Sequence, residues 1–259
     1  MSETDVRVLV NVTDGVADVV LNRSAKRNAL DTAMFEAILS TIEDLGARDD
    51  VRAVVLSGAG GAFSAGIDLS LLAGGPADQG LQARTHGPAN AFQQVAWGWR
   101  ALPVPVIAAI EGVCFGGGLQ IALGADLRIA RPDARLAVME ARWALVPDMA
   151  GFPLLRGLVR ADVLRELVYT AREVSGTEAA SIGLATRVAD DPHTEAMDLA
   201  RHMAAQHPET TRAAKRLLGL TVDEYADPAT LLLAESVEQE KLLGSAAMAA
   251  LLGSRTTGR

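Results

Sequence analysis

Gly116, Gly117 and Gly118 form the segment of this sequence that is best suited to hold a negatively charged atom. The run lies between an apolar stretch, 104–109, and a helical segment, 119–123. Without side chains, a ligand can approach backbone N–H groups at the start of a helix, where unpaired donors and the helix dipole favour negative charge. The run therefore predicts a site for an anion, or for an oxyanion that develops during a reaction.

A second backbone donor is expected near Ala65, in the small-residue segment that follows the apolar stretch 51–56. Ser64, Ala65 and Gly66 leave room for a ligand to reach the main chain, as the glycine run does. An ordinary glycine-rich turn in which Asp68 caps the next helix would have the same composition. Because the segment occurs together with the glycine run, we interpret the two as halves of one ligand site.

The elements that must position these segments alternate between short strands and helices. Alternating valines on either side of Asp14-Gly15 predict a β-hairpin. Asp31 caps a helix whose apolar residues recur at helical spacing, and Ser175-x-x-Glu178 is a capping box before another. Further strands are expected at 51–56, 104–109, 127–130, 136–139 and 186–189, helices at 193–206, 208–218 and 227–243, and a loop with helical pieces at 72–98.

The chain of 259 residues is long enough for one large domain, or for one domain with a small appendage. The last predicted strand ends just before residue 190, and the remainder is helical. We therefore expect a core at 1–191 and a C-terminal helical region at 192–259. The apolar faces of the C-terminal helices are expected to pack on another subunit.

Composition and charge exclude several classes of function. The formal net charge of -8 gives no general attraction to nucleic acid or anionic lipid, so an anionic ligand needs a local basic patch. Cys114 is the only cysteine, which excludes an intramolecular disulfide, and its apolar surroundings indicate a buried structural thiol. The charged residues near the N-terminus do not fit a secretory signal, and no apolar run approaches membrane-spanning length. We expect a cytoplasmic protein with neither a nucleic-acid nor a membrane partner.

Several motifs, taken together, resemble those of the crotonase (enoyl-CoA hydratase/isomerase) superfamily, in the family's order and over nearly the whole chain. The resemblance implies an α/β fold, built as a spiral of repeated β-β-α units with a C-terminal helical region. The motifs are Leu21-Asn22-Arg23, Asn28-Ala29-Leu30, the segment from Ser57-Gly58 to Asp68, 106–112 with the glycine run, 125–130, Gly183-Leu184-Ala185 and Ala214-Lys215.

The resemblance also implies the substrate. Crotonases bind acyl-CoA thioesters and stabilise an enolate oxygen with two backbone N–H groups, which map to Ala65 and Gly117. Coenzyme A enters as part of the substrate, so we expect neither a separate cofactor nor a metal. Arg23, Lys26 and Arg27 supply local positive charge for its phosphates, although a solvated charged turn would look the same. The other implied contacts are Gly66, Ile67, Asp68 and Gly116. Trp143 has a large rigid ring that would suit the wall of an acyl pocket, and it would equally suit a core.

The acid and base residues depart from the pattern of the family's hydratases, which carry two glutamates. The first of those positions holds Gln120, which can bind a water but cannot take its proton, whereas the second holds Glu140. Asp148 stands where simple hydratases commonly have glycine, and the pair that it makes with Glu140 resembles that of dienoyl-CoA isomerases. Asp148 could instead cap the segment after Pro147.

The leading hypothesis is therefore an isomerase that shifts the double bond of an unsaturated acyl-CoA, with Glu140 moving protons and Asp148 assisting. One alternative is an enoyl-CoA hydratase (lyase) that uses Glu140 on a water positioned by Gln120, and another is a noncatalytic acyl-CoA-binding protein. A serine hydrolase would use Ser64, which stands too far beyond its strand for a nucleophile elbow. The resemblance further implies a homotrimer or a dimer of trimers.

Overall fold

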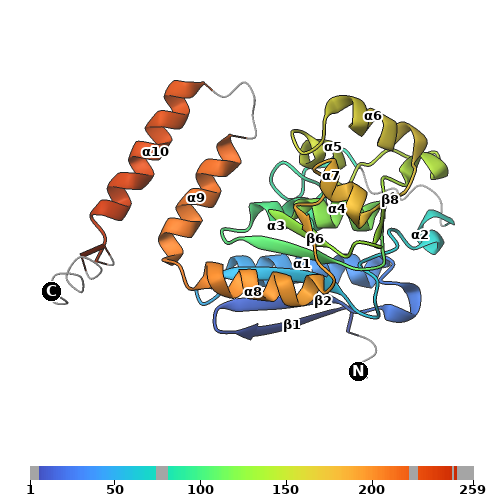
Figure 1. Ribbon diagram of the computed structural model, residues 1–259, viewed down its shortest axis with the longest axis horizontal. Coiled ribbons are helices and arrows are strands. Elements are labelled where there is room, and N and C mark those ends of the chain that lie inside the picture. Colours follow the sequence, from blue (N-terminus) through green and yellow to red (C-terminus); the bar gives the residue numbers. More distant parts are fainter. Residues whose placement is uncertain (1–5, 74–80, 222–226, 247, 250–259) are drawn as a thin grey trace. The chain divides into compact units, whose positions relative to one another are not determined.

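The computed structural model describes residues 6–73, 81–221, 227–246, 248 and 249 (Figure 1). Backbone contacts divide the chain into two compact units, Met1–Ala205 and Gln206–Arg259. The first unit extends beyond residue 191, where the sequence placed the boundary, because helix α8 (Pro192–Ala204) packs on its sheet. All the predicted site residues lie in this first unit.

The first unit is built on a 6-stranded sheet in the order β1-β2-β3-β4-β6-β9. Strands β1 and β2 pair antiparallel, whereas neighbours from β2 to β9 pair parallel. Strands β5, β7 and β8 form a smaller sheet, so that consecutive strands such as β4 and β5 enter different sheets. The strands are β1 (Val8–Thr13), β2 (Val16–Leu21), β3 (Ala53–Gly58), β4 (Val106–Ile110), β5 (Val113–Phe115), β6 (Leu127–Ala130), β7 (Arg135–Ala137), β8 (Val174–Ser175) and β9 (Arg187–Val188).

The N-terminal hairpin forms as the sequence predicts. Thr13 pairs with Val16, which leaves Asp14 and Gly15 as the loop. Both loop residues have positive φ, +51° and +80°, as a type I′ turn requires, and Asp followed by Gly tolerates this conformation. This two-residue loop fixes the register of β2 against β1, and the other edge of β2 pairs with β3.

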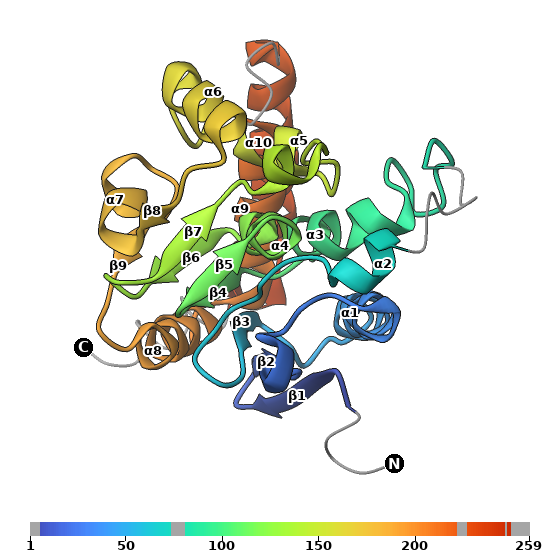
Figure 2. The same ribbon diagram turned by 90° about the vertical axis from the view of Figure 1, so that its right-hand side faces the viewer.

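Helices cover both faces of the central strands, which is why these parallel strands are apolar throughout. Successive side chains of a strand point to opposite faces. Val55 of β3 lies in an apolar cluster with Ala196 of α8, whereas Leu56 lies in a separate cluster with Ile38 and Leu119. Figure 2 shows the strands between α8 and the helices of that second cluster. The helices of that cluster include α1 (Thr32–Gly46), α3 (Ala91–Ala101) and α4 (Gly117–Gly124).

The β-β-α unit is clearest where β4 and β5 lead into α4, and the fold is of the predicted α/β class. Helix α3 continues to Ala101, beyond the segment 72–98 in which a loop with helical pieces is expected. Its capping box, in which Asn90 and Gln93 cap each other's backbone, was readable in the sequence. The remaining helical elements of the first unit are η2 (Ser24–Lys26), α2 (Leu69–Ala73), η3 (Glu140–Trp143), α5 (Gly151–Leu155), α6 (Ala161–Thr170) and α7 (Gly176–Ser181).

The second unit contains α9 (Pro208–Leu220) and α10 (Pro228–Leu243). Arg216 and Glu238 join the two helices by an ion pair of 2.7 Å. Apolar side chains such as Leu218 and Leu232 are exposed on them. Packing of these faces on another subunit stays a prediction. Within the described residues, no helix is both long enough and apolar enough to cross a lipid bilayer.

The contact between α3 and α4 generates the first testable prediction. A Cβ added to Gly124 would lie 2.1 Å from the carbonyl oxygen of Ala96, which is backbone and cannot rotate away. We expect Gly124→Ala to lower the free energy of unfolding by about 1–3 kcal/mol, measured by urea denaturation. Gly46→Ala is the matched control, because Gly46 also ends a helix and its added Cβ would lie an ordinary 3.6 Å from Leu102. Equal stability of the two variants would contradict the tight packing.

Candidate active site

The residues predicted to bind substrate gather around one cavity of about 410 Å³ in the first unit. Its walls come from the loops after β2 and β3, the start of α4, and η3. The predicted residues in these walls are Lys26, Ala65, Gly66, Ile67, Asp68, Gly116, Gly117, Glu140 and Trp143. Four other predicted residues, Arg23, Arg27, Gln120 and Asp148, lie outside the lining of this cavity.

Gly116 and Gly117 place a backbone N–H at the cavity wall. Gly116 has a φ of +51°, which side chains rarely permit, and turns the chain from β5 into α4. A Cβ on Gly116 would lie 3.3 Å from Oε1 of Glu140, and a Cβ on Gly117 would lie 2.8 Å from Sδ of Met149. The Gly117 N–H forms no hydrogen bond within the described residues. It is therefore a free donor at the positive end of the α4 dipole.

The other predicted donor already has an acceptor. The Ala65 N–H donates to the carbonyl oxygen of Arg27 at 2.8 Å. The next N–H, that of Gly66, donates to Oγ of Ser64 at 3.2 Å. The role of Ala65 in an oxyanion hole stays a prediction, and it requires the Arg27 carbonyl to share or release this N–H.

Ser64 is not placed as the nucleophile of a hydrolase. Its side chain is fully buried, and its hydroxyl donates to the carbonyl oxygen of Asn28 at 2.8 Å. The same oxygen accepts the Gly66 N–H. A nucleophilic serine needs a base that takes its hydroxyl proton, whereas the Ser64 hydroxyl donates to a backbone carbonyl, which is not a base. These contacts therefore do not support the serine hydrolase alternative.

Cys114 lies fully buried in β5, as predicted for a structural thiol. Burial raises the pKa of this thiol well above its usual value, which disfavours the reactive thiolate.

Across the described ranges, no group of three or more His, Cys, Asp or Glu side chains is arranged to hold a metal ion.

Glu140 and Gln120 form a buried pair beside the glycine run. Gln120 Nε2 donates to Glu140 Oε1 at 2.6 Å, and since an ionised carboxylate can only accept, this contact fixes the orientation of the amide. Gln120 Oε1 and Glu140 Oε2 are both buried without a hydrogen-bond partner among the described residues. Burial raises the pKa of Glu140, the hydrogen bond from Gln120 lowers it, and the negative charge of Asp148 raises it again.

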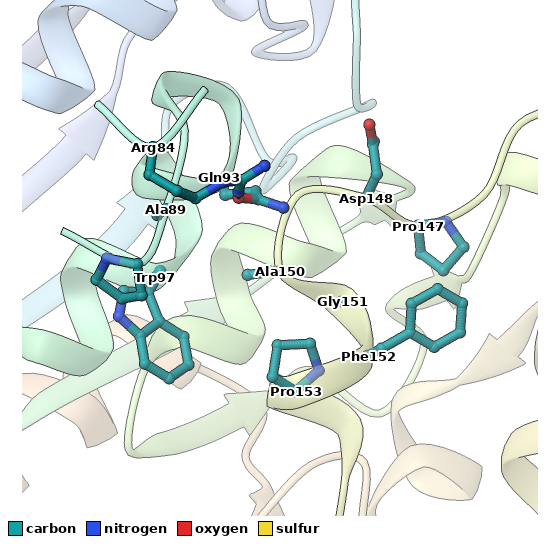
Figure 3. A pocket seen from close by; sticks show the side chains of 11 residues that line it. Arg84, Ala89, Gln93, Trp97, Pro147, Asp148, Ala150, Gly151, Phe152 and Pro153 are labelled. Atoms are coloured by element: carbon teal, nitrogen blue, oxygen red, sulfur yellow. The ribbon is translucent and has the colours of Figure 1, made fainter. Parts of the chain in front are cut away.

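Asp148 lines a second cavity, of about 290 Å³, together with Pro147 and Phe152 (Figure 3). Its side chain is exposed, yet neighbouring protein atoms remove part of its hydration and raise the pKa of its carboxyl. It does not cap α5, whose N-cap forms no side-chain hydrogen bond. Its negative charge raises the pKa of Glu140, and the two acids line different cavities.

The predicted cations divide into two groups. Arg23 is used within the fold, since its guanidinium pairs with Asp68 at 2.5 Å and Asp31 at 3.2 Å. Lys26 lines the cavity and Arg27 is exposed beside it, and neither forms an ion pair within the described residues. Phosphate contact is therefore expected from Lys26 and Arg27, whereas Arg23 fixes the loop that carries Asp68.

Residues that the sequence did not single out complete the site. Asn28 is fully buried, and its Nδ2 donates to the carbonyl oxygens of Ala59 at 2.9 Å and Ala62 at 2.8 Å. Its Oδ1 accepts the Arg23 N–H at 2.8 Å, so one amide ties the loop after β2 to the loop after β3. Asn28 is part of the motif Asn28-Ala29-Leu30, but its spacing in the sequence did not predict that it would join these two loops. The other walls are Ala29, Leu69, Met139 and Leu145, which look like core residues in sequence.

Comparison with known proteins identifies the family of this chain. Residues 11–243 match the model of the family described as Enoyl-CoA hydratase/isomerase. The chain belongs to the enoyl-CoA hydratase/isomerase family. Methylglutaconyl-CoA hydratase of Mus musculus is 31% identical to this family member over 231 residues, which cover 85% of this chain and 72% of the relative. Enoyl-CoA hydratase EchA19 of Mycobacterium tuberculosis is 32% identical over 200 residues, or 76% of this chain and 74% of the relative.

Solved structures of enoyl-CoA hydratases have the same fold as this family member. Enoyl-CoA hydratase from Bacillus anthracis superposes with a TM-score of 0.88 and 28% identity, over 98% of this chain and 97% of that one. A protein of Thermobifida fusca that was solved in complex with CoA gives a TM-score of 0.84 at 29% identity, over 96% and 98% of the two chains. These matches confirm the crotonase resemblance and the fold class expected from it.

The contacts of Arg23 predict how stability depends on pH. Its hydrogen bond lowers the pKa of Asp68 to about 2, so this pair stabilises the fold fully above 3.8, the ordinary value, and progressively less as pH falls through 2. We expect Arg23→Met to lower the free energy of unfolding by about 1 kcal/mol at neutral pH, and the deficit to shrink toward pH 2. Urea denaturation of both proteins at several pH values measures it. Arg48→Met, which breaks an exposed pair with Asp50, is the control, and a deficit for Arg23→Met that grew in acid would contradict the assignment.

Proposed function

We propose that this protein shifts the double bond of an unsaturated acyl-CoA thioester. The observation that carries the proposal is that Glu140 is the carboxyl group of the main cavity placed to carry a proton. Asp68 also lines that cavity, but with a pKa of about 2 it stays ionised and does not exchange protons near neutral pH. A double-bond shift needs a single group that takes a proton and returns it, which Glu140 can do alone.

Several observations support a CoA thioester as the substrate. The protein of Thermobifida fusca that shares this fold was solved in complex with CoA. Lys26 is an exposed cation in the cavity wall and Arg27 is the exposed cation next to it in sequence, in a chain whose net charge is -8. Cations without acidic partners in the described residues are free to bind phosphate oxygens.

The first step forms an enolate. Ionised Glu140 takes the proton from the carbon next to the thioester carbonyl, and the electron pair of that C–H bond moves into the carbonyl, so that negative charge develops on its oxygen. The free Gly117 N–H donates to this oxygen at the α4 terminus, and the Ala65 N–H joins it if Arg27 releases it. One such donor contributes about 3 kcal/mol to the stability of the transition state in comparable sites.

The second step returns the proton at the far end of the conjugated system. Protonated Glu140 gives its proton to that carbon, the electrons move back from the oxygen, and the double bond lies at its new position. No atom is gained or lost. Burial and the charge of Asp148 both raise the pKa of Glu140, which makes it a better base and brings it nearer to the working pH.

Hydration of a 2-enoyl-CoA is the second candidate. The relatives from Mus musculus and Mycobacterium tuberculosis are both named hydratases. Gln120 Oε1 and Glu140 Oε2, buried and unpaired within the described part of the chain, suit hydrogen bonds to a water. In this reaction Glu140 would act alone on a water that Gln120 orients.

A panel of CoA esters tests the proposal. We expect 3-enoyl-CoA and 3,5-dienoyl-CoA to be converted to products of changed retention and unchanged mass, and 2-enoyl-CoA to gain no water, by liquid chromatography with mass spectrometry. Glu140→Gln should lower turnover by about 100-fold or more while CoA esters still bind, because the amide cannot take a proton. Addition of water by the parent protein would instead support the hydratase.

The same panel separates the remaining alternatives. If hydration is native, Gln120→Glu should raise it several-fold, because a second carboxylate would then assist the attacking water. No gain from this variant, together with isomerase activity of the parent, counts against hydration. Binding of CoA esters without turnover of any of them would show a noncatalytic acyl-CoA-binding protein.

The pH profile tests the partnership of the two acids. Because Glu140 must be ionised to act as a base, kcat/KM should fall on the acid side at a pH above 4.5, the ordinary value for glutamate. Asp148→Asn removes a negative charge that raises this pKa, so the acid limb should move to lower pH. Asp162→Asn, which neutralises an exposed acid paired with Arg160, should leave the limb in place. A limb that does not move with Asp148→Asn would contradict the coupling.

A further inference from the structure

The second cavity has a chemical character that the double-bond shift does not use. Figure 3 shows Arg84, Gln93 and Trp97 on one side of it and Pro147, Phe152 and Pro153 on the other. Most of its walls are apolar, and the exceptions are Arg84, Gln93 and Asp148. An apolar pocket with a few convergent polar groups is the usual form of a site for part of a ligand.

This cavity lies next to the reacting groups. Gln120 donates to Glu140 through Nε2, and its Oε1 lies 2.7 Å from where a Cβ on Gly151 would be. Glu140 is a wall of the main cavity and Gly151 is a wall of the second one. The buried Gln120 side chain therefore lies between a wall residue of the main cavity and a wall residue of the second one, so the two cavities adjoin.

Arg84 is held in this cavity by neutral groups. Its Nε donates to the carbonyl oxygen of Gln82 at 3.0 Å, its Nη2 to that of Leu81 at 2.8 Å, and its Nη1 to Oε1 of Gln93 at 2.6 Å. It forms no ion pair with any acid in the described ranges. The guanidinium is thus oriented in advance, with N–H groups and a full positive charge left for a ligand.

Gln93 adds a second donor. Its Oε1 accepts from the Asn90 N–H at 3.0 Å and from Arg84, so the amide oxygen is occupied twice. Its Nε2 forms no hydrogen bond within the described residues. An oriented guanidinium beside a free amide N–H matches the two oxygens of a carboxylate. A hydrocarbon end would bury these donors without replacing the hydrogen bonds that they make to water.

We propose that the second cavity binds the far end of the acyl chain, and that Arg84 and Gln93 recognise a carboxylate there. The substrate class is then the CoA monothioester of an unsaturated dicarboxylic acid. This inference rests on the proposed function for the direction of the chain, with the thioester at Gly117. Asp148 is the acid of the same cavity, and Figure 3 shows its carboxylate turned away from Phe152 and Pro153.

Binding of unreactive esters tests the inference without requiring turnover. Pairs of saturated CoA esters of equal chain length are compared by calorimetry, one member ending in a carboxylate and the other in a methyl group. We expect the carboxylate ester of the best-fitting length to bind about tenfold tighter or more. Arg84→Met should abolish this preference, and Arg84→Lys, which also loses the loop contacts but keeps the charge, should retain part of it.

Arg165→Met removes an exposed cation that lies outside both cavities, and it should leave the preference unchanged. Equal binding of the two esters by the parent protein overturns the inference, as does a preference that survives in Arg84→Met. The inference is also overturned if Arg84→Lys loses the preference as completely as Arg84→Met. The preference would then depend on the loop contacts of Arg84 and not on its charge. If no unsaturated ester turns over, the proposed function fails, while the affinity ratio still decides this inference.

Discussion

The buried hydrogen bond from Gln120 to Glu140, at 2.6 Å, is the contact on which the chemistry of this site depends. A glutamate at position 120 would set two carboxylates against each other, and their shared charge would alter the titration of both. The neutral amide instead gives Glu140 a donor and cannot itself exchange a proton. Burial and the charge of Asp148 raise the pKa of the single carboxyl group that remains.

Close approach of backbone around this pair constrains the rest of the site. Gly116 brings the main chain next to the Glu140 carboxylate, and Gly151 lets Gln120 lie against α5. Gly66 has a φ of +89°, and a Cβ there would lie 2.7 Å from the carbonyl oxygen of Phe115. The glycines are therefore required by the geometry of two adjoining loops as well as by access for a ligand. The same closeness puts the Gly117 N–H and the Glu140 carboxylate at one cavity.

Turns and helix caps could be predicted from the sequence, because they depend on the types of a few neighbouring residues. The positive φ values at Asp14 and Gly15 follow from the residue types, as does the Asp31 side chain that accepts the Met34 N–H at the start of α1. The cavity walls at Ala65, Gly117 and Glu140 followed from motifs that are read together. In each case the residue type itself limits what the backbone or the side chain can do.

Contacts between distant segments were not predictable in this way. Sequence suggested that Arg23 faces phosphate, but which acids lie beside it depends on how the loops after β2 and β3 meet, and they place Asp68 there. The hydrogen bond from Ala65 to the Arg27 carbonyl has the same origin. The role proposed for Arg84 was not predictable from sequence either. It depends on the cavity that Arg84 lines, whose opposite wall comes from α5 and the loop before it.

The most direct test of this account is a crystal structure of the Glu140→Gln variant with an unsaturated acyl-CoA bound, since the substitution slows turnover and keeps the size of the side chain. The account predicts that the thioester oxygen accepts the Gly117 N–H and that the carbons to be deprotonated and reprotonated lie beside residue 140. A thioester oxygen away from the α4 terminus, or a reactive carbon beyond reach of residue 140, would contradict it.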